Sequence, residues 1–166
     1  MGNNSAKYKG VPTDLQFIVN NGNHFTGYFD RTDLSGHGTI IYQFGAKYEG
    51  EFENGKPHGL GKVIFIDGMT FEGEFKNGFL HGSCIIIDQL GNIFKGTWTD
   101  GKRHGQFIYT TTQGSVYECI FENGECSWLR EENGLFNEKT ISELITIDEK
   151  TASDLITKDE NKKHLA

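Results

Sequence analysis

Histidine recurs in this sequence at a fixed interval, and a row of imidazoles can bind a metal ion or relay a proton. His58, His81 and His104 lie 23 residues apart, and each is followed by glycine. A metal site needs ligands that converge, usually closely spaced and joined by cysteine or carboxylate partners. No such spacing is evident, so we expect structural turn histidines and no metal site.

The other reactive side chains form no catalytic pattern. Cys84, Cys119 and Cys126 make no CxxC pair and have no basic neighbours to activate a thiolate. Nucleophile-elbow spacing, a phosphate-binding loop and a dinucleotide fingerprint are all absent from the sequence. The Gly-Lys pairs at 55–56 and 101–102 are turn residues. The sequence therefore predicts no catalytic residues, no cofactor and no enzymatic activity.

Charge and composition narrow the class of partner. The net charge is −7 and the pI is near 5.3, which opposes nucleic-acid binding and weakens binding to anionic membranes. No apolar run approaches the roughly 18 residues of a membrane span. The three cysteines show no pattern of a disulfide framework, which favours a reducing compartment. We expect a cytoplasmic protein. Met1-Gly2 opens like a myristoylation signal, but Ala6 replaces the required hydroxyl residue, so a frayed polar terminus is the preferred interpretation.

An internal repeat of 23 residues organises the chain. A typical unit begins with an aromatic residue, has glycine two positions later, a second aromatic residue two positions after that, and then an Asn-Gly or Asp-Gly pair; in the last unit Cys119 replaces the first glycine. The clearest unit, residues 48–70, reads YEGEFENGKPHGLGKVIFIDGMT. Its two aromatic positions and their equivalents are Tyr48, Phe52, Phe71, Phe75, Phe94, Trp98, Tyr117 and Phe121.

This pattern predicts stacked β-hairpins. Alternation along a strand places Tyr48, Gly50 and Phe52 on one face, with Glu49 and Glu51 on the other. The Asn-Gly and Asp-Gly pairs favour tight hairpin turns, and the second strand is expected around residues 62–66. One hairpin buries too little to be stable alone. Stacked hairpins give a single-layer, twisted antiparallel sheet, an elongated rod or gutter about 45–55 Å long.

The unit resembles the MORN (membrane occupation and recognition nexus) repeat over about residues 15–130. We predict four full repeats, starting at residues 25, 48, 71 and 94, with a half-unit at each end. The unit at Phe25 is degenerate: Thr32 replaces the turn glycine, and His-Gly is shifted to His37-Gly38. Residues 1–14 are expected to be a flexible N-terminus.

Residues 131–166 form an acidic tail, with nine acidic and five basic residues. Thr140 and Glu143 have capping-box spacing, and the apolar residues that follow fall roughly on one helical face, so we predict a helical tail. Two interpretations stay open: the tail covers the edge of the last hairpin, or it docks a partner. The sheet edges would also allow end-to-end or homodimer contacts.

A single-layer sheet has no second layer to cover its aromatic residues, so part of the row should stay accessible as a groove. Such a groove suits an amphipathic helix of a partner protein. The eight aromatic residues above are therefore the predicted partner-binding residues. If the rings are instead wholly core, the binding face must lie on the side of Glu49 and Glu51.

The resemblance implies a non-enzymatic scaffold, because proteins similar to this one occur in cytoskeletal and ciliary assemblies such as radial spoke heads. An axonemal or cytoskeletal setting is the expectation that follows. The alternative is a peripheral membrane module that binds phosphoinositides, as the family name suggests; the repeats carry no basic stripe, which opposes it. Some relatives carry the repeats beside a catalytic domain, but 36 residues after the repeats are too few for one.

Overall fold

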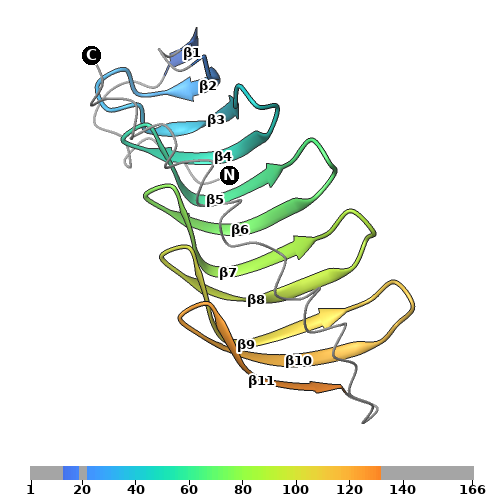
Figure 1. Cartoon of the computed structure of the whole chain (residues 1–166). Coiled ribbons are helices and arrows are strands. Elements are labelled where there is room, and N and C mark those ends of the chain that lie inside the picture. The colour runs from blue at the N-terminus through green and yellow to red at the C-terminus, as the bar shows by residue number, and fades with distance from the viewer. Residues whose placement is uncertain (1–12, 19–21, 132–166) are drawn as a thin grey trace, which may run out of the picture.

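The computed structural model describes residues 13–18 and 22–131, and these form one antiparallel sheet (Figure 1). Eleven strands lie side by side in chain order, and β1 and β11 are the two ends of an open sheet. The strands are β1 (Thr13–Ile18), β2 (His24–Phe29), β3 (Gly36–Ile41), β4 (Lys47–Glu53), β5 (Lys56–Ile64), β6 (Thr70–Lys76), β7 (Phe79–Ile87), β8 (Ile93–Thr99), β9 (Lys102–Thr110), β10 (Val116–Glu122) and β11 (Glu125–Glu131). Ten intervals of about 4.8 Å give a stack about 48 Å long.

The tight turns have the geometry that their residues predict. Asn54 and Gly55 both have positive φ, 52° and 73°, as a type I′ hairpin turn requires. The three later Asn-Gly or Asp-Gly pairs, at 77–78, 100–101 and 123–124, repeat this pair of positive angles. Because two residues suffice for the turn, β5 starts at Lys56 rather than near residue 62. The pairing register changes between Gly50 and Phe52, and this irregularity accommodates the additional residues of β5 between Pro57 and Gly61.

A row of small residues crosses the sheet perpendicular to the strands. Register pairs join Gly27, Gly38, Gly50, Gly61, Gly73, Cys84 and Gly96 from β2 to β8. The row lets rings lie flat on the backbone, because a Cβ at Gly61 would overlap the Tyr48 ring and one at Gly96 would overlap the Phe107 ring. These glycines therefore leave space for neighbouring rings.

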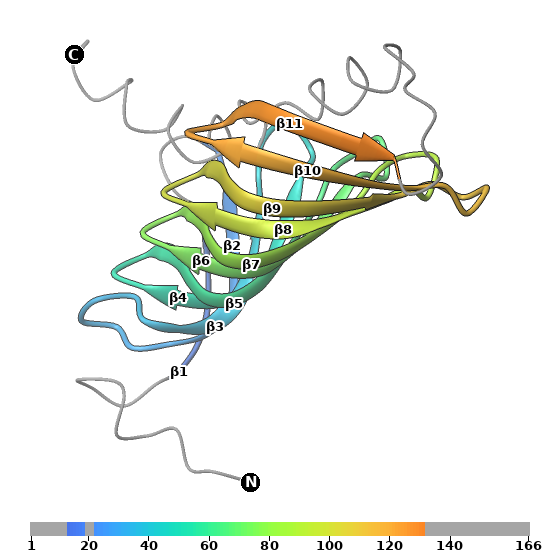
Figure 2. The same cartoon turned by 90° about the horizontal axis from the view of Figure 1, so that it is seen from below.

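The aromatic face is the core of the protein. The eight aromatic residues expected to line a groove are all buried, with exposed fractions of 0–8 %. The prediction that part of this row stays accessible is therefore wrong. The physical reason is interleaving between hairpins: the Tyr48 ring lies 5.1 Å from both Phe52 and Phe75, so it fills the space beside its own unit and the next. The sheet is also strongly curved rather than flat (Figure 2).

The first unit is less degenerate than its sequence indicates. Ser35 and Gly36, not His37 and Gly38, occupy the His-Gly position, because the Ser35 hydroxyl accepts the backbone N–H of Asn54, as His58 accepts that of Asn77. The predicted helical tail, residues 131–166, lies outside the described residues from 132 onward. Within the described part of the chain, no helix has the length and apolar character needed to cross a membrane.

Candidate functional site

The opposite face of the sheet carries a groove. It has a volume of about 830 Å³ and crosses seven strands, from β3 to β9. The groove-lining residues other than the small-residue row are His37, Glu49, Leu60, Lys62, Glu72, Ser83, Ile85, Lys95, Thr97, Gln106 and Ile108. Four glycines of the small-residue row form its floor. The eight aromatic residues line none of it, so the groove lies on the face opposite the one that the sequence predicts for a partner.

Alternation along each strand produces this groove directly. Cross-strand register puts Glu72 opposite Ile85, Ile85 opposite Lys95, and Lys95 opposite Ile108, in one row along the stack. Because side chains alternate between faces, these residues point away from the core that their neighbours build. The glycines of the floor have no side chains to fill the centre of the groove. The longer side chains on both sides of them therefore form its walls.

Ion pairs organise the part of the groove over β4–β6. Lys62 Nζ lies 3.0 Å from Glu72 Oε2, and Lys47 Nζ lies 2.7 Å from Glu49 Oε2. The hydrogen bond and positive charge of Lys47 lower the pKa of the Glu49 carboxyl below its usual value. The Glu51 carboxylate accepts the backbone N–H of Leu60 at 3.3 Å. All these pairs are exposed to solvent, so they position side chains more than they stabilise the fold.

The part of the groove over β7–β9 is aliphatic. Ile85 and Ile108 line it, with exposed fractions of 38 % and 42 %. Ile87 and Ile93, which pair directly across β7 and β8, extend the apolar surface on the same face and are also exposed. Lys95 is the one cation among the described residues that line this part.

On the aromatic face, polar atoms are mostly satisfied. The Tyr48 hydroxyl donates to the backbone carbonyl of Glu51 at 2.8 Å, and burial raises the pKa of the phenol far above its usual value. Arg103 lies over the Phe121 ring, 4.4 Å from its centre. Trp98 Nε1 is the one buried side-chain nitrogen or oxygen without a hydrogen-bond partner among the described residues. Among the described residues, the eight aromatic side chains of this face are all buried.

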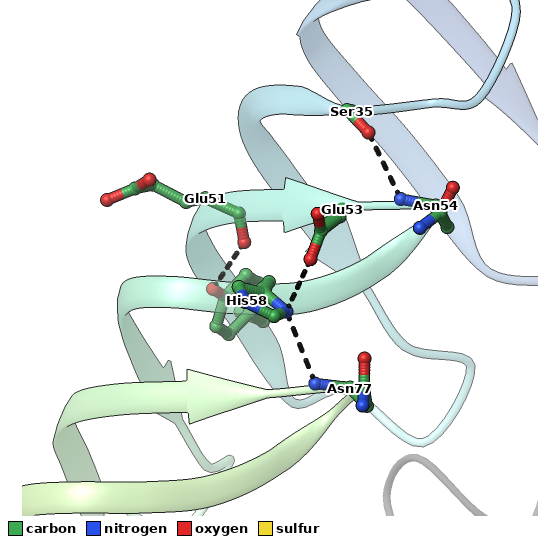
Figure 3. Close-up of polar contacts among 7 residues, drawn as sticks. Ser35, Glu51, Glu53, Asn54, His58 and Asn77 are labelled. Carbon is green, nitrogen blue, oxygen red and sulfur yellow. Dashed lines mark hydrogen bonds and ion pairs between the residues drawn. The ribbon is translucent and has the colours of Figure 1, made fainter. Parts of the chain in front are cut away.

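The histidines connect successive hairpins. His58 Nδ1 lies 3.5 Å from the backbone nitrogen of Asn77 (Figure 3). His81 Nδ1 lies 3.5 Å from the backbone nitrogen of Asp100. A nitrogen can accept a hydrogen bond only when it carries no proton. The 3.0 Å contact between His58 Nδ1 and Glu53 Oε2 needs a proton on Nδ1 instead, and the acceptor role is the one that the Ser35 hydroxyl shares.

A backbone bond accompanies each of these links. The turn glycine of each hairpin donates its N–H to a carbonyl of the preceding hairpin: Gly55 to Leu34, Gly78 to Pro57, Gly101 to Leu80 and Gly124 to Arg103, at 2.8–3.2 Å. Each hairpin tip is thus joined to the one before it. The sequence predicts a structural role for the histidines, and His58 and His81 have one, because each accepts a backbone N–H of the next hairpin tip.

The remaining candidate residues do not form a reactive site. Burial raises the pKa of the Cys84 and Cys119 thiols to about 12, which suppresses their thiolates. In the described residues, no three His, Cys, Asp or Glu side chains come close enough to hold a metal ion. That the protein needs no metal and catalyses no reaction stays a prediction.

Comparison with known proteins identifies the repeat. The family model of the MORN repeat matches residues 48–70, 71–88 and 94–116, so the chain carries consecutive MORN repeats. No curated protein matches the chain. Among solved structures, the chain is similar to the TCP domain of SAS-4 (dCPAP) of Drosophila melanogaster, which was solved in complex with a proline-rich motif of Ana2 (dSTIL). Sequence identity is 14 %, the match covers 75 % of this chain and 86 % of that one, and the TM-score is 0.31.

Proposed function

We propose that this protein is a non-enzymatic scaffold whose groove face binds an amphipathic helix of a partner protein. One observation carries the proposal: a groove of about 830 Å³ runs across seven strands of a repeat sheet. Its six intervals of about 4.8 Å give a length of about 29 Å, which a helix of about 19 residues would fill. MORN repeats are themselves typical of a repeat scaffold or binding module.

The walls of the groove suit a protein partner better than a lipid headgroup. Two lysines and two glutamates line it, so it has no net positive charge to attract a phosphoinositide. Exposed isoleucine and leucine side chains beside polar ones match the two-sided character of an amphipathic helix. The resemblance to MORN proteins of cytoskeletal and ciliary assemblies is the support for a setting in such an assembly.

Site-specific photocrosslinking tests this proposal. A photoreactive amino acid at Ser83 or Gln106 in the groove should crosslink a partner in cells, and mass spectrometry should map the crosslink to an amphipathic segment. The same group at exposed Gln113, outside the groove, is the matched control. The mapped segment, made as a peptide, should bind the purified protein. A partner that crosslinks equally from Gln113, or none from either groove position, would contradict the proposal.

A further inference from the structure

The two ends of the groove differ in chemistry. Over β4–β6, four carboxylates surround it, those of Glu49, Glu51, Glu72 and Glu74. Two lysines, Lys47 and Lys62, pair with Glu49 and Glu72, so these six side chains carry a net charge of −2. The groove residues of β7–β9 include no carboxylate and one lysine.

Glu51 and Glu74 hold equivalent places one repeat apart. Glu51 pairs with groove-lining His37, and Glu74 pairs with groove-lining Leu60. A Cβ placed at Gly59 would meet the Glu51 carboxylate, and one at Gly82 would meet that of Glu74, so both carboxylates lie over glycines at the groove margin. The glycines thus allow two negative charges to approach the backbone floor.

The aliphatic end presents its anchors at the spacing of the repeat. Ile85 and Ile108 belong to the same row, two strands apart, which is about 9.6 Å. Seven residues of an α-helix advance about 10.5 Å, so a helix with one anchor per heptad stays in register with successive hairpins when it tilts slightly. Lys95 lies in the row between the two isoleucines.

From this arrangement we infer that the groove selects a helix with two unlike halves: basic residues over β4–β6 and heptad-spaced aliphatic residues over β7–β9. The basic half is N-terminal, since the positive end of a helix dipole then faces the carboxylates and the negative end faces Lys95. This inference rests on the proposed function and specifies the partner's chemistry. Desolvated isoleucines supply affinity, while the charges set direction and the rate of encounter.

Synthetic helices test the inference directly. The probe is a peptide of about three heptads with lysine at the groove-facing positions of its N-terminal half and leucine at those of its C-terminal half. Two control peptides have the same composition, one with the halves exchanged and one with lysine and leucine alternating through both halves. Fluorescence anisotropy should show that the probe binds the purified protein about 3- to 10-fold more tightly than either control.

Two variants test what each end of the groove contributes to binding of the probe peptide. Glu51→Gln/Glu74→Gln removes the charge but keeps one acceptor oxygen at each position, so it should weaken probe binding about 3- to 10-fold and flatten its salt dependence. Glu122→Gln/Glu125→Gln makes the same charge change on the last hairpin and should have no such effect. Ile85→Thr/Ile108→Thr keeps β-branching and should weaken binding about 10-fold with the salt dependence unchanged. All variants should melt like the parent protein, because every altered side chain is exposed except that of half-buried Glu51. At that position glutamine keeps an oxygen that can accept the Leu60 N–H.

The outcomes separate this inference from the function on which it rests. Equal binding of all three peptides, or of none, would overturn the two-halved partner. A photocrosslinked helix that loses affinity with Ile85→Thr/Ile108→Thr but not with Glu51→Gln/Glu74→Gln would also overturn it, while the scaffold function would stand. Failure of the groove positions to crosslink any partner would instead contradict the proposed function.

Discussion

Ile85, Ile86 and Ile87 are consecutive and identical, yet they lie in two different environments. Ile86 is fully buried among the aromatic residues, whereas Ile85 and Ile87 are 38 % and 39 % exposed on the groove face. The period of two along a strand separates them. A single layer of backbone therefore has a face that holds the fold together and a face that is available to a partner.

The two faces of the sheet differ in how their side chains pack. On the core face, large rings interleave between hairpins and lie on glycines, so each repeat completes the packing of its neighbours. On the groove face, ion pairs and isolated isoleucines leave side chains in contact with water. Stability should depend on the first face and binding on the second, and each prediction below tests that division.

Truncation of a core ring should have the largest effect. Phe71→Ala, Phe94→Ala and Trp98→Ala should each lower the free energy of unfolding by about 3–5 kcal/mol, because each leaves a cavity among buried rings. Urea denaturation measures the change. Trp98→Phe is the control: it keeps an aromatic ring and removes a buried N–H that has no partner, so most of the stability should return. A near-native midpoint for all three alanine variants would show that the row is accessible after all.

Thiol reactivity should divide the cysteines by burial. The pKa of Cys84 and Cys119 rises from 9.0 to about 12, so at a given pH their thiolate fractions are about a thousand-fold lower than in an exposed thiol. With a disulfide reagent at pH 8, half-buried Cys126 should react first and the other two far more slowly. Cys126→Ser should remove the fast phase, and denaturant should make all remaining thiols equivalent. Three fast thiols in the native protein would contradict the buried face.

The same shift predicts the sign of an alkaline effect. Above about pH 9 the unfolded chain loses thiol protons that the folded chain keeps until about pH 12. The unfolded state then binds fewer protons, so the free energy of unfolding should fall as the pH rises through this window. Below pH 9 both states hold these protons, and the two thiols should cause no pH dependence there.

The hairpins and their face assignment could be predicted because they depend on local chemistry. Asn54-Gly55 specifies a turn, and alternation from Tyr48 onward assigns each side chain to a face whatever the rest of the chain does. The mixed surface of Glu49, Lys62 and Ile85 carries the same 23-residue period as the rings, but its varied residue types gave no comparable signal.

Burial of the rings could not be predicted, since it depends on how far a ring reaches between repeats. Tyr48 is covered partly by Phe75, which belongs to the next unit, and by its approach to Gly61 on the paired strand. The equivalence of Ser35 to His58 was missed for a similar reason: it appears in the hydrogen bond to the following turn, not in residue type. Sequence period alone, Ser35 being 23 residues before His58, could have found it.

Loss of the links between hairpin tips should have a modest effect. His58→Ala/His81→Ala removes two long hydrogen bonds at half-exposed sites, so the free energy of unfolding should fall by about 1 kcal/mol in total. His58→Asn/His81→Asn is the matched control, because the amide oxygen stands close to the position of Nδ1 and can accept the same N–H. Urea denaturation at neutral pH should show recovery with asparagine. Equal loss with asparagine and alanine would mean that the links contribute nothing.

The smallest effect on stability should come from a residue of the groove face that is adjacent in sequence to a core residue. Ile85→Ala should lower the free energy of unfolding by less than about 1 kcal/mol, because the side chain already contacts water. Ile86→Ala, one position away, should lower it by about 2–5 kcal/mol through a core cavity. Composition and sequence context are nearly the same in the two variants. The difference between their urea midpoints therefore measures the effect of the face on which the side chain lies. Binding should reverse the order: with folded protein at matched concentration, Ile85→Ala should weaken a groove-bound helix and Ile86→Ala should leave its affinity unchanged. If both variants lost stability equally, the groove face would be a second core. Stability would then depend on both faces rather than on the aromatic face.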